Sequence, residues 1–420
     1  MAARCALALL VSLIAASSAR GGVVQFDNSQ PVLDVNGQQV DAHDGMIVQF
    51  DTPHGLYYRY AIEYGLYTEV GHLRSNGGGC ENHCGTCGGF RMDHNVSVWT
   101  SPTLGSGTWT LVTREALPIA TRPVASYYRP KVIFNPATGL YVLWVNYAPG
   151  GYGNNGKYLS ATSPKPEGPF AIAVVDVAID VWVGNHGDFD LFRDDVDGRA
   201  YVLYTCYCGP GGPGGTTVSV VELTPDYLNA TAGRSAPLAN GGRTSAPVWA
   251  ESPALFSSAG FYYALITHVC CFCRQGGGVS VFTAAHPLGP WSDVAYDIGC
   301  QNRSSDVDGC WSSVGEFNTP ACGGQGYSWS GAQQNNVFAV STAAGPPLWV
   351  WTGDRWYSSP DAMKGHDLQH WAPLMWGPPN ASAPFPTAPV IDFIGNPITW
   401  NYTSPTNVGD SSEAPPPRAP

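Results

Sequence analysis

A two-strand unit recurs five times along this 420-residue chain. Each copy has an apolar strand, a short turn that contains Gly or Pro, and a second strand rich in aromatic and β-branched residues, which is the pattern of a β-hairpin. The turns lie near Gly55, Gly139, Gly198, Gly260 and Pro347. A third strand ending in a Pro-containing turn follows most of the hairpins. Sheets of about four strands repeated around an axis are typical of a β-propeller. The repeat therefore predicts one all-β domain, a five-bladed β-propeller over residues 25–403.

The composition agrees with this fold. The chain has 50 Gly and 35 Pro, 12% aromatic residues and only 12% charged residues. Turn formers at this density separate short strands, and the aromatic side chains can fill the spaces between blades. A β-sandwich or a jelly roll would have a similar composition, but neither accounts for a five-fold repeat. We expect Cys-rich loop insertions at about 71–93 and 292–333, where the intervals between hairpins are longest.

The charge of the chain excludes one class of partner. The formal net charge is −12, whereas a nucleic-acid-binding protein needs a basic surface. Beyond the N-terminus, no apolar stretch reaches the roughly 18 residues of a membrane span. We therefore expect no nucleic-acid partner and no membrane attachment, and we expect a monomer.

The N-terminus indicates export. Residues 1–19 combine an early Arg, an apolar run and a small-residue cleavage pattern, which is typical of a secretory signal peptide. Residues 404–420 form a polar, Pro-rich tail that we expect to be disordered. Asn-x-Ser/Thr sequons agree with a secreted glycoprotein; they lie at Asn95, Asn229, Asn302, Asn380 and Asn401.

Cysteines also fit an extracellular protein. Eleven of the 12 cysteines follow the predicted signal peptide, in clusters at 80–87, 206–208, 270–273 and 300–322. In an oxidising compartment we expect disulfides, with one cysteine left over. The spacing of Cys80, Cys84 and Cys87 around His83 leaves a zinc site as the alternative. These clusters follow second strands or precede an innermost strand, so we expect all of them on the face of the propeller that holds the pocket. Cross-linked loops there would narrow the cleft and favour attack at the ends of a substrate chain.

Polar residues gather at the starts of the innermost strands. Successive blades of a propeller begin these strands on the same face, so the residues there converge on the axis. The positions are Asp44, Tyr128 with Arg129, Asp188, Glu251 and Gln333. Inverting glycoside hydrolysis uses a protonated carboxylic acid and a carboxylate about 6.5 to 9.5 Å away, with room for a water molecule. A third carboxylate near the acid helps to keep it protonated. The convergence of Asp44, Asp188 and Glu251 therefore predicts carboxylate acid/base catalysis.

Short motifs around these residues carry a family resemblance. They are Ala42–Ile47, Tyr57–Tyr60, Arg129–Asn135, Gly187–Phe192, Glu251–Ala254 and Gly353–Trp356. Together they resemble glycoside hydrolase family 43, the inverting five-bladed propeller enzymes, and most closely its exo-β-1,3-galactanase-like subfamily. The resemblance covers residues 35–400, across all five blades, and implies a glycosidase that acts on a β-linked polysaccharide or oligosaccharide.

The resemblance also implies roles. Glu251 corresponds to the general acid and Asp188 to the residue that tunes and orients it. The subfamily usually has Gly at the position of Asp44 and uses a Gln of the fifth blade instead, which Gln333 or the adjacent Gln334 matches. The subfamily has Glu where this chain has Tyr128. Either Asp44 or Gln333 is therefore expected to position the attacking water.

Tyr128 and Arg129 at the axis are expected to bind substrate. Further candidates are expected either to bind substrate or to pack in the core. Glu63 lies one residue from a substrate-binding Glu of the subfamily, and a strand-end charge is the alternative. Tyr147, Tyr207 and Trp356 are expected to stack on sugars or to pack between blades. We expect no cofactor, although a structural calcium at the axis, as in parts of the family, is an alternative. A non-catalytic carbohydrate-binding propeller and an arabinan- or xylan-active glycosidase remain the alternative functions.

Overall fold

The structure is a computed structural model of the chain. It describes residues 22–51, 55–65, 92, 94–149, 156–179, 186–206, 217–235, 237–238, 250–268, 278–292, 296–298, 332–343, 345–377, 390–392 and 399–404. None of the helices in these ranges has the length and apolar character that a membrane span requires.

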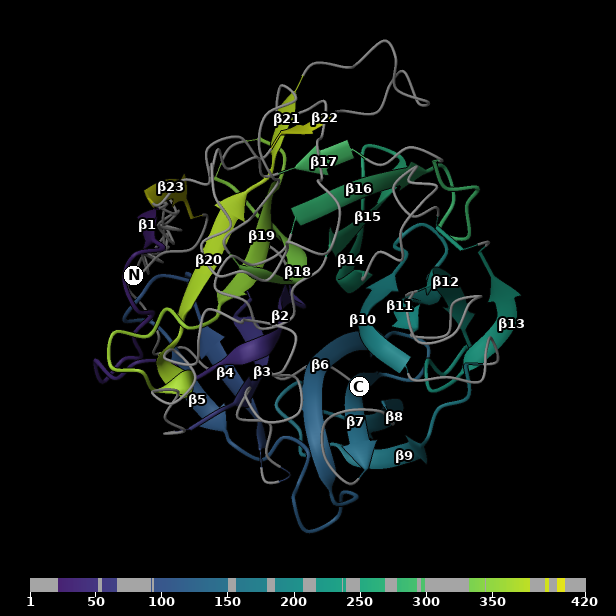
Figure 1. Cartoon of the computed structure of the whole chain (residues 1–420), viewed down its shortest axis with the longest axis horizontal. Helices are drawn as coiled ribbons and strands as arrows, with labels where there is room; N and C mark the ends of the chain where they lie inside the picture. The colour runs from purple at the N-terminus through teal and green to yellow at the C-terminus, as the bar shows by residue number, and fades with distance from the viewer. Residues whose placement is uncertain are drawn as a thin grey trace, which may run out of the picture.

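Five antiparallel sheets surround a central axis (Figure 1). Blade 1 has strands β2 (His43–Gln49), β3 (Tyr57–Glu63), β4 (Asn95–Ser101) and β5 (Thr110–Thr113). Blade 2 has β6 (Ala125–Asn135), β7 (Leu140–Pro149), β8 (Lys157–Ser163) and β9 (Ala171–Val175). Blade 3 has β10 (His186–Arg193), β11 (Ala200–Cys206), β12 (Thr217–Leu223) and β13 (Ala230–Arg234). Blade 4 has β14 (Ala250–Ser258), β15 (Phe261–His268), β16 (Gly278–Ala284) and β17 (Tyr296–Ile298). Blade 5 has β18 (Gln333–Val340), β19 (Leu348–Arg355) and β20 (Leu368–Pro373).

The innermost strands β2, β6, β10, β14 and β18 contact one another in a closed ring, with β18 next to β2. All five predicted hairpins are present as β2–β3, β6–β7, β10–β11, β14–β15 and β18–β19. Local turn chemistry explains the success, because Gly139, Gly198 and Gly260 take the positive φ values that such turns need. The five-bladed propeller prediction is confirmed.

One apolar cluster lies between each pair of neighbouring blades. The cluster between blades 2 and 3, for example, packs Trp144 and Tyr158 against Phe189. Equivalent clusters join the other blades, and aromatic residues contribute to all five. The predicted placement of aromatic side chains between blades is therefore confirmed.

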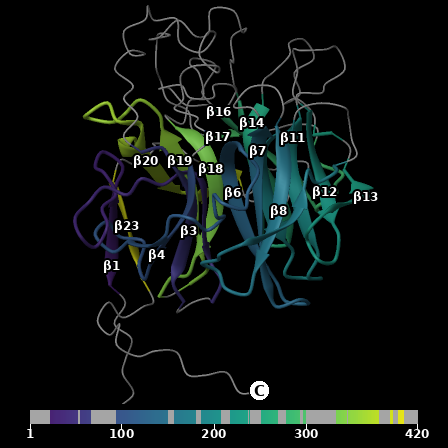
Figure 2. The same cartoon turned by 90° about the horizontal axis from the view of Figure 1, so that it is seen from below.

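The ends of the described chain close the ring between blades 5 and 1. Strand β1 (Val23–Asp27) pairs antiparallel with β23 (Thr399–Thr403), and the two lie side by side at the edge of the molecule (Figure 2). Trp400 stacks on Phe26 at 4.3 Å between ring centroids and donates its indole N–H to the Trp371 carbonyl of β20 at 2.7 Å. This pair of strands thus packs beside the three-stranded blade 5. A shorter ribbon pairs β21 (Met375–Gly377) with β22 (Val390–Asp392).

Every innermost strand has a β-bulge near its start, where its register with the second strand shifts. Asp44, Arg129 and Ser252 lie in these bulges with φ values of 62°, 54° and 49°. Beside Asp44, a Cβ on Gly45 would lie 1.8 Å from the Tyr60 carbonyl oxygen, so only glycine fits there. The bulges redirect polar side chains toward the axis.

Replacing Trp400 with Ala should destabilise the fold by about 3–5 kcal/mol, because the variant loses a buried aromatic side chain and a buried hydrogen bond. Thermal and denaturant unfolding measure the change. Val196→Ala is the control, since Val196 is 89% exposed and its truncation should stay within about 0.5 kcal/mol of wild type. Equal stability of the two variants would contradict a closing role for β1 and β23.

Candidate active site

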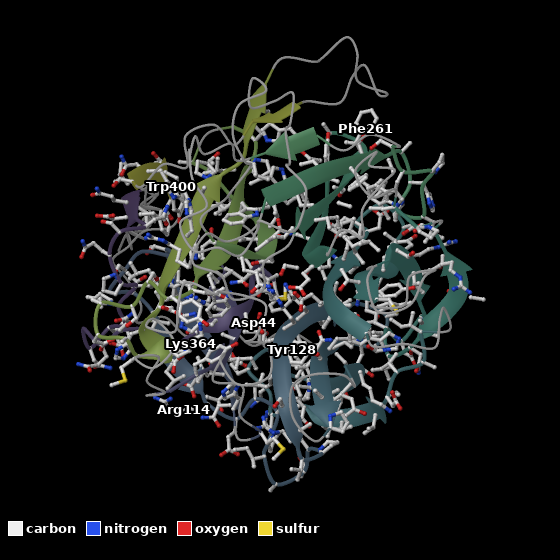
Figure 3. All side chains as sticks on the ribbon, in the orientation of Figure 1. Asp44, Arg114, Tyr128, Phe261, Lys364 and Trp400 are labelled. Atoms are coloured by element: carbon white, nitrogen blue, oxygen red, sulfur yellow. The ribbon has the colours of Figure 1, made fainter. Side chains whose placement is uncertain are left out.

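Polar side chains from all five innermost strands meet at the axis. Asp44 and Tyr128 lie near the centre of the ring (Figure 3). Asp44, Tyr128, Arg129, Glu251 and Gln333 are all buried. In a low-dielectric environment of this kind, each charge needs a partner. The contacts among these residues therefore determine what the axis can do.

The guanidinium of Arg129 connects the innermost strand of blade 2 to those of all four other blades. Its Nε lies 2.8 Å from Oδ1 of Asp44 on β2, and its Nη2 donates to Oδ2 of Asp188 on β10 at 2.9 Å. Nη2 also donates to the Ser252 hydroxyl on β14, and Nη1 donates to Oδ1 of Asn335 on β18 at 2.9 Å. Burial disfavours this cation, but the charges of Asp188 and Asp44 outweigh burial and raise the pKa of Arg129.

A second buried cation lies two residues further along β6. Nζ of Lys131 donates to the Asn335 carbonyl of β18 at 2.5 Å and to the Gly45 carbonyl of β2 at 3.2 Å. It also lies 3.3 Å from Oδ1 of Asp190 on β10. Blade 2 thus contributes two cations that hold the innermost strands together.

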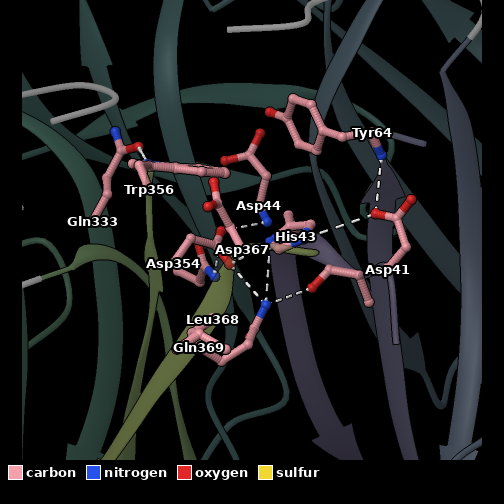
Figure 4. Close-up of polar contacts among 12 residues, drawn as sticks. Asp41, His43, Asp44, Tyr64, Gln333, Asp354, Trp356, Asp367, Leu368 and Gln369 are labelled. Atoms are coloured by element: carbon pink, nitrogen blue, oxygen red, sulfur yellow. Dashed lines mark hydrogen bonds and ion pairs between the residues drawn. The ribbon is translucent and has the colours of Figure 1, made fainter. Parts of the chain in front are cut away.

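Asp44 is held on two sides. Its backbone N–H donates to Oδ2 of Asp354 at 2.7 Å (Figure 4), and its Oδ2 accepts the Arg129 backbone N–H at 3.3 Å. Burial raises the pKa of Asp44 to about 7; Arg129 opposes this rise, and the negative charges of Asp188 and Asp354 add to it. A carboxyl with this pKa changes its charge near neutral pH and can act as a base there.

Asp354 is the ionised partner that fixes Asp44. Its carboxylate accepts hydrogen bonds from Nδ1 of His43 at 3.1 Å, from Asn335 at 2.9 Å and from Gln369 at 2.9 Å. Burial would raise the pKa of Asp354, but the hydrogen bond and charge of His43 outweigh it, so the pKa is lowered. Burial likewise disfavours the imidazolium of His43, but Asp354 outweighs burial and raises the pKa of His43. The other ring nitrogen, Nε2, faces the Gly365 carbonyl at 3.2 Å, so each ring nitrogen has an acceptor within hydrogen-bond distance.

Asp188 is hydrogen-bonded to the backbone next to Glu251. Its Oδ2 accepts the N–H of Ser252 at 3.0 Å and the Ser252 hydroxyl at 2.9 Å. These contacts fix the bulge of β14 immediately after Glu251, and Arg129 holds Asp188 from the other side. Asp188 is therefore placed to orient the Glu251 backbone.

Gln333, and not Gln334, faces the candidate acid. Nε2 of Gln333 lies 3.3 Å from Oε2 of Glu251, and its Oε1 accepts the indole N–H of Trp356 at 2.7 Å. Gln334 points into the interface of blades 4 and 5, where its Oε1 accepts the indole N–H of Trp351 at 2.7 Å. The structure thus selects between the two registers that the sequence left open.

Tyr128 lies among the three candidate carboxylates. Burial raises the pKa of its phenol, and the charges of Asp188, Asp44 and Glu251 raise it further, in that order. The phenol is therefore neutral at physiological pH, and all three carboxylates are close enough to act on it. The predicted convergence of Asp44, Asp188 and Glu251 is present in the structure.

The remaining predicted residues lie in different surroundings. Glu63 binds Asn95 at 2.9 Å and pairs with Arg114 within blade 1; burial raises the pKa of Glu63. Tyr147 is buried, and its ring stacks on Tyr127. Trp356 has no exposed surface and lies behind Gln333. In this structure Tyr147 and Trp356 pack between blades. Tyr207 lies outside the described residues.

Three residues of the axial network were not assigned a site role from sequence. Asp354 and Ser252 belong to motifs that carried the resemblance. Asp354 lies on a second strand and Ser252 is an uncharged residue, so neither was predicted to contact other residues at the axis. Asn335 follows Gln333 and Gln334, which match the Gln of the subfamily, and no sequence pattern marks Asn335 itself. Only its position within the β18 bulge shows that it faces Arg129.

The described residues include no cluster of ionisable side chains that could bind a metal ion. No group of three or more His, Cys, Asp or Glu among them is arranged to hold one. Asp44 and Asp188 instead pair with the guanidinium of Arg129, and Asp354 is hydrogen-bonded to His43. The calcium alternative stays a prediction, and no chemical step proposed for this protein uses a metal. Of the cysteines after residue 19, Cys206 alone lies within the described residues, at the end of β11, so the disulfide pairing and the cleft-narrowing loops stay predictions.

At the sequence level, no protein-family model matches the chain. A comparison with curated protein sequences also finds no significant similarity.

Solved structures share the fold. The chain is similar to the exo-β-1,3-galactanase of Phanerochaete chrysosporium, in a glutamate-to-glutamine variant with β-1,3-galactotriose, with a TM-score of 0.58 and 20% identity over 92% of this chain and 70% of that one. The exo-β-1,3-galactanase of Clostridium thermocellum has a TM-score of 0.56 and 17% identity over 92% of this chain and 69% of that one. A family 43 β-1,3-galactosidase with galactodeoxynojirimycin has a TM-score of 0.55 and 18% identity over 87% of this chain and 98% of that one. The chain therefore has the five-bladed propeller fold of these family 43 structures, as the motifs predicted.

Proposed function

We propose that the protein is a secreted glycoside hydrolase of the family 43 type, which cleaves a galactan-type β-linked polysaccharide from its chain ends with inversion. One observation carries the proposal: Asp44, Asp188 and Glu251, from three different blades, all lie near the buried side chain of Tyr128 at the axis. The fold supports it, because structures of this shape include exo-β-1,3-galactanases that bind galactan oligosaccharides or galactose. Secretion and attack at chain ends rest on the predicted signal peptide and the predicted cysteine-rich loops.

Glu251 is the proposed general acid. Its Oε2 accepts a hydrogen bond from Gln333, and the protonated carboxyl passes its proton to the glycosidic oxygen. Asp188 is a positioning residue, since it holds the backbone of Ser252 beside the acid. Arg129 has the same kind of role, because its donors contact the other blades and hold Asp44 and Asp188 in place.

Asp44 is the proposed base that removes a proton from the attacking water. It is a carboxyl with a pKa of about 7, which suits proton acceptance near neutral pH. Gln333 presents its N–H group toward Glu251, while its oxygen already accepts a hydrogen bond from Trp356. Gln333 is the second candidate for positioning the water, through the remaining lone pair of its oxygen.

A non-catalytic carbohydrate-binding propeller is the second candidate function. Tyr128 favours it, since a neutral buried phenol lies where the galactanase-like subfamily has a carboxylate. Arabinan or xylan are the alternative substrates for a glycosidase. Hydrolysis tests separate these possibilities.

Glu251→Gln should lower galactose release from β-1,3-galactan by about 10²- to 10⁴-fold, because the amide cannot donate a proton to the leaving oxygen. The matched control is Glu222→Gln, which removes a carboxylate on β12 that pairs with Arg199 at 3.4 Å; this variant should retain wild-type rates. Reducing-end and galactose assays measure both. Equal release by wild type and Glu251→Gln would contradict the proposed acid. If wild type releases no sugar from galactan, arabinan or xylan but binds one of them, the binding function replaces the enzymatic one.

Asp44→Asn should lower kcat/KM by about 10²- to 10⁴-fold, since the amide cannot accept the proton of water. Because burial raises the pKa of Asp44 to about 7, the wild-type carboxylate form dominates only above that pH, and kcat/KM should rise as the pH increases through 7. In Gln333→Ala, kcat/KM should still rise as the pH increases through 7, because this variant retains Asp44. Far-UV circular dichroism melts check that each variant folds. A wild-type profile that is flat between pH 5 and 7, together with an active Asp44→Asn variant, would assign the water to Gln333 instead.

A further inference from the structure

The amide of Gln333 lies between two groups of opposite hydrogen-bonding character. On one side is the indole N–H of Trp356, 2.7 Å from Oε1 (Figure 4). On the other side is Oε2 of Glu251, 3.3 Å from Nε2. An indole N–H can only donate, so the amide oxygen must face Trp356. The amide N–H group must then face Glu251.

Trp356 is itself held in a buried ionic cluster. Nζ of Lys364 lies 3.7 Å from the centroid of the indole ring and 2.9 Å from Oδ2 of Asp367, and neither charged side chain is exposed. The Asp367 carboxylate also accepts the backbone N–H groups of Tyr357 at 3.1 Å and Ser358 at 2.9 Å. These contacts fix the turn that follows β19, and with it the direction of the indole N–H.

We propose that Trp356 is a positioning residue that fixes the Gln333 amide as a hydrogen-bond donor to Glu251. The role in catalysis rests on the proposed function, in which Glu251 is the acid. With an N–H group facing Oε2, that oxygen accepts a hydrogen bond, and the carboxylate that remains after proton transfer keeps its donor. A flipped amide would turn its oxygen toward Glu251 and oppose the charged form.

Other groups near Glu251 also influence its protonation. Tyr128 and Arg129 come from β6, Asp188 from β10 and Asp44 from β2. None of these four residues is substituted in a Trp356 variant. The Gln333 amide is neutral, so its effect on Glu251 depends on its orientation alone.

The test is Trp356→Phe, which keeps an aromatic ring beside Lys364 but removes the N–H group together with part of the indole ring; the control below makes the same loss of ring volume. The freed amide can rotate, Glu251 loses a fixed donor, and its protonated form persists to higher pH. We expect the alkaline limb of the kcat/KM profile to move up by about 1 pH unit, a tenfold change in the protonation equilibrium. A purely structural loss would lower the rate at every pH and leave the limb in place.

Trp144→Phe is the matched control. Trp144 is also fully buried, and its indole N–H donates to the Tyr227 carbonyl at 2.8 Å, between blades 2 and 3. This variant loses an equivalent hydrogen bond away from the axis and should keep the wild-type limb. Gln333→Ala should also move the limb upward, and adding Trp356→Phe to it should move the limb no further, because Trp356 acts through Gln333. An additional shift in the double variant would overturn the proposal.

A carbon-13 NMR titration of the Glu251 carboxyl tests the contact without any turnover. Glutamate labelled at the carboxyl carbon is incorporated, and Glu251→Gln identifies the signal. The titration midpoint should move upward in Trp356→Phe and stay in place in Trp144→Phe. Coincident midpoints in wild type and Trp356→Phe would overturn the inference, whether or not the protein is active. A moved midpoint in a protein that hydrolyses no glycan would support the contact and reject only the proposed function.

Discussion

The guanidinium of Arg129 is the interaction on which the rest of the structure depends. It starts on blade 2 and contacts Asp44, Asp188, Ser252 and Asn335 on the four other innermost strands. A buried cation without partners is costly, and so is each carboxylate that loses its cation. The ring of blades and the carboxylate cluster therefore stabilise each other: the closed propeller brings the carboxylates together, and Arg129 offsets their repulsion.

Different surroundings give the carboxyl groups different properties. Asp354 has three side-chain donors and stays ionised, whereas Asp44 has a pKa of about 7 because burial and neighbouring negative charges oppose its ionisation. Asp188 is committed to Arg129 and Ser252. Glu251 faces the neutral amide of Gln333. Groups of one chemical type can thus serve as anchor, base, positioning residue and acid, which is how active sites separate acid and base functions at one pH.

Much of the fold could be predicted because its signals are local. Turn glycines such as Gly139 and Gly198 mark hairpins within a few residues, and the repeat then fixes the number of blades. The convergence of Asp44, Asp188 and Glu251 followed from topology. The bulges could not be predicted in this way, because a register shift depends on the pairing between strands. The bulge of β6 contains Arg129, whose guanidinium contacts the other innermost strands at the axis. The burial of Trp356 and the pairing of Asp354 with His43 also depend on contacts between residues far apart in sequence, about 310 positions for the latter pair.

A crystal structure of Glu251→Gln with a β-1,3-galactan oligosaccharide tests the central claim most directly. The account predicts a glycosidic oxygen beside residue 251, a water molecule on Asp44 at the opposite face of the sugar, and about 6.5 to 9.5 Å between the two side chains, as inversion requires. Arg129 should keep its contacts to Asp44 and Asp188. A sugar bound away from the axis, or an Arg129 guanidinium that leaves these carboxylates to bind the sugar, would contradict it.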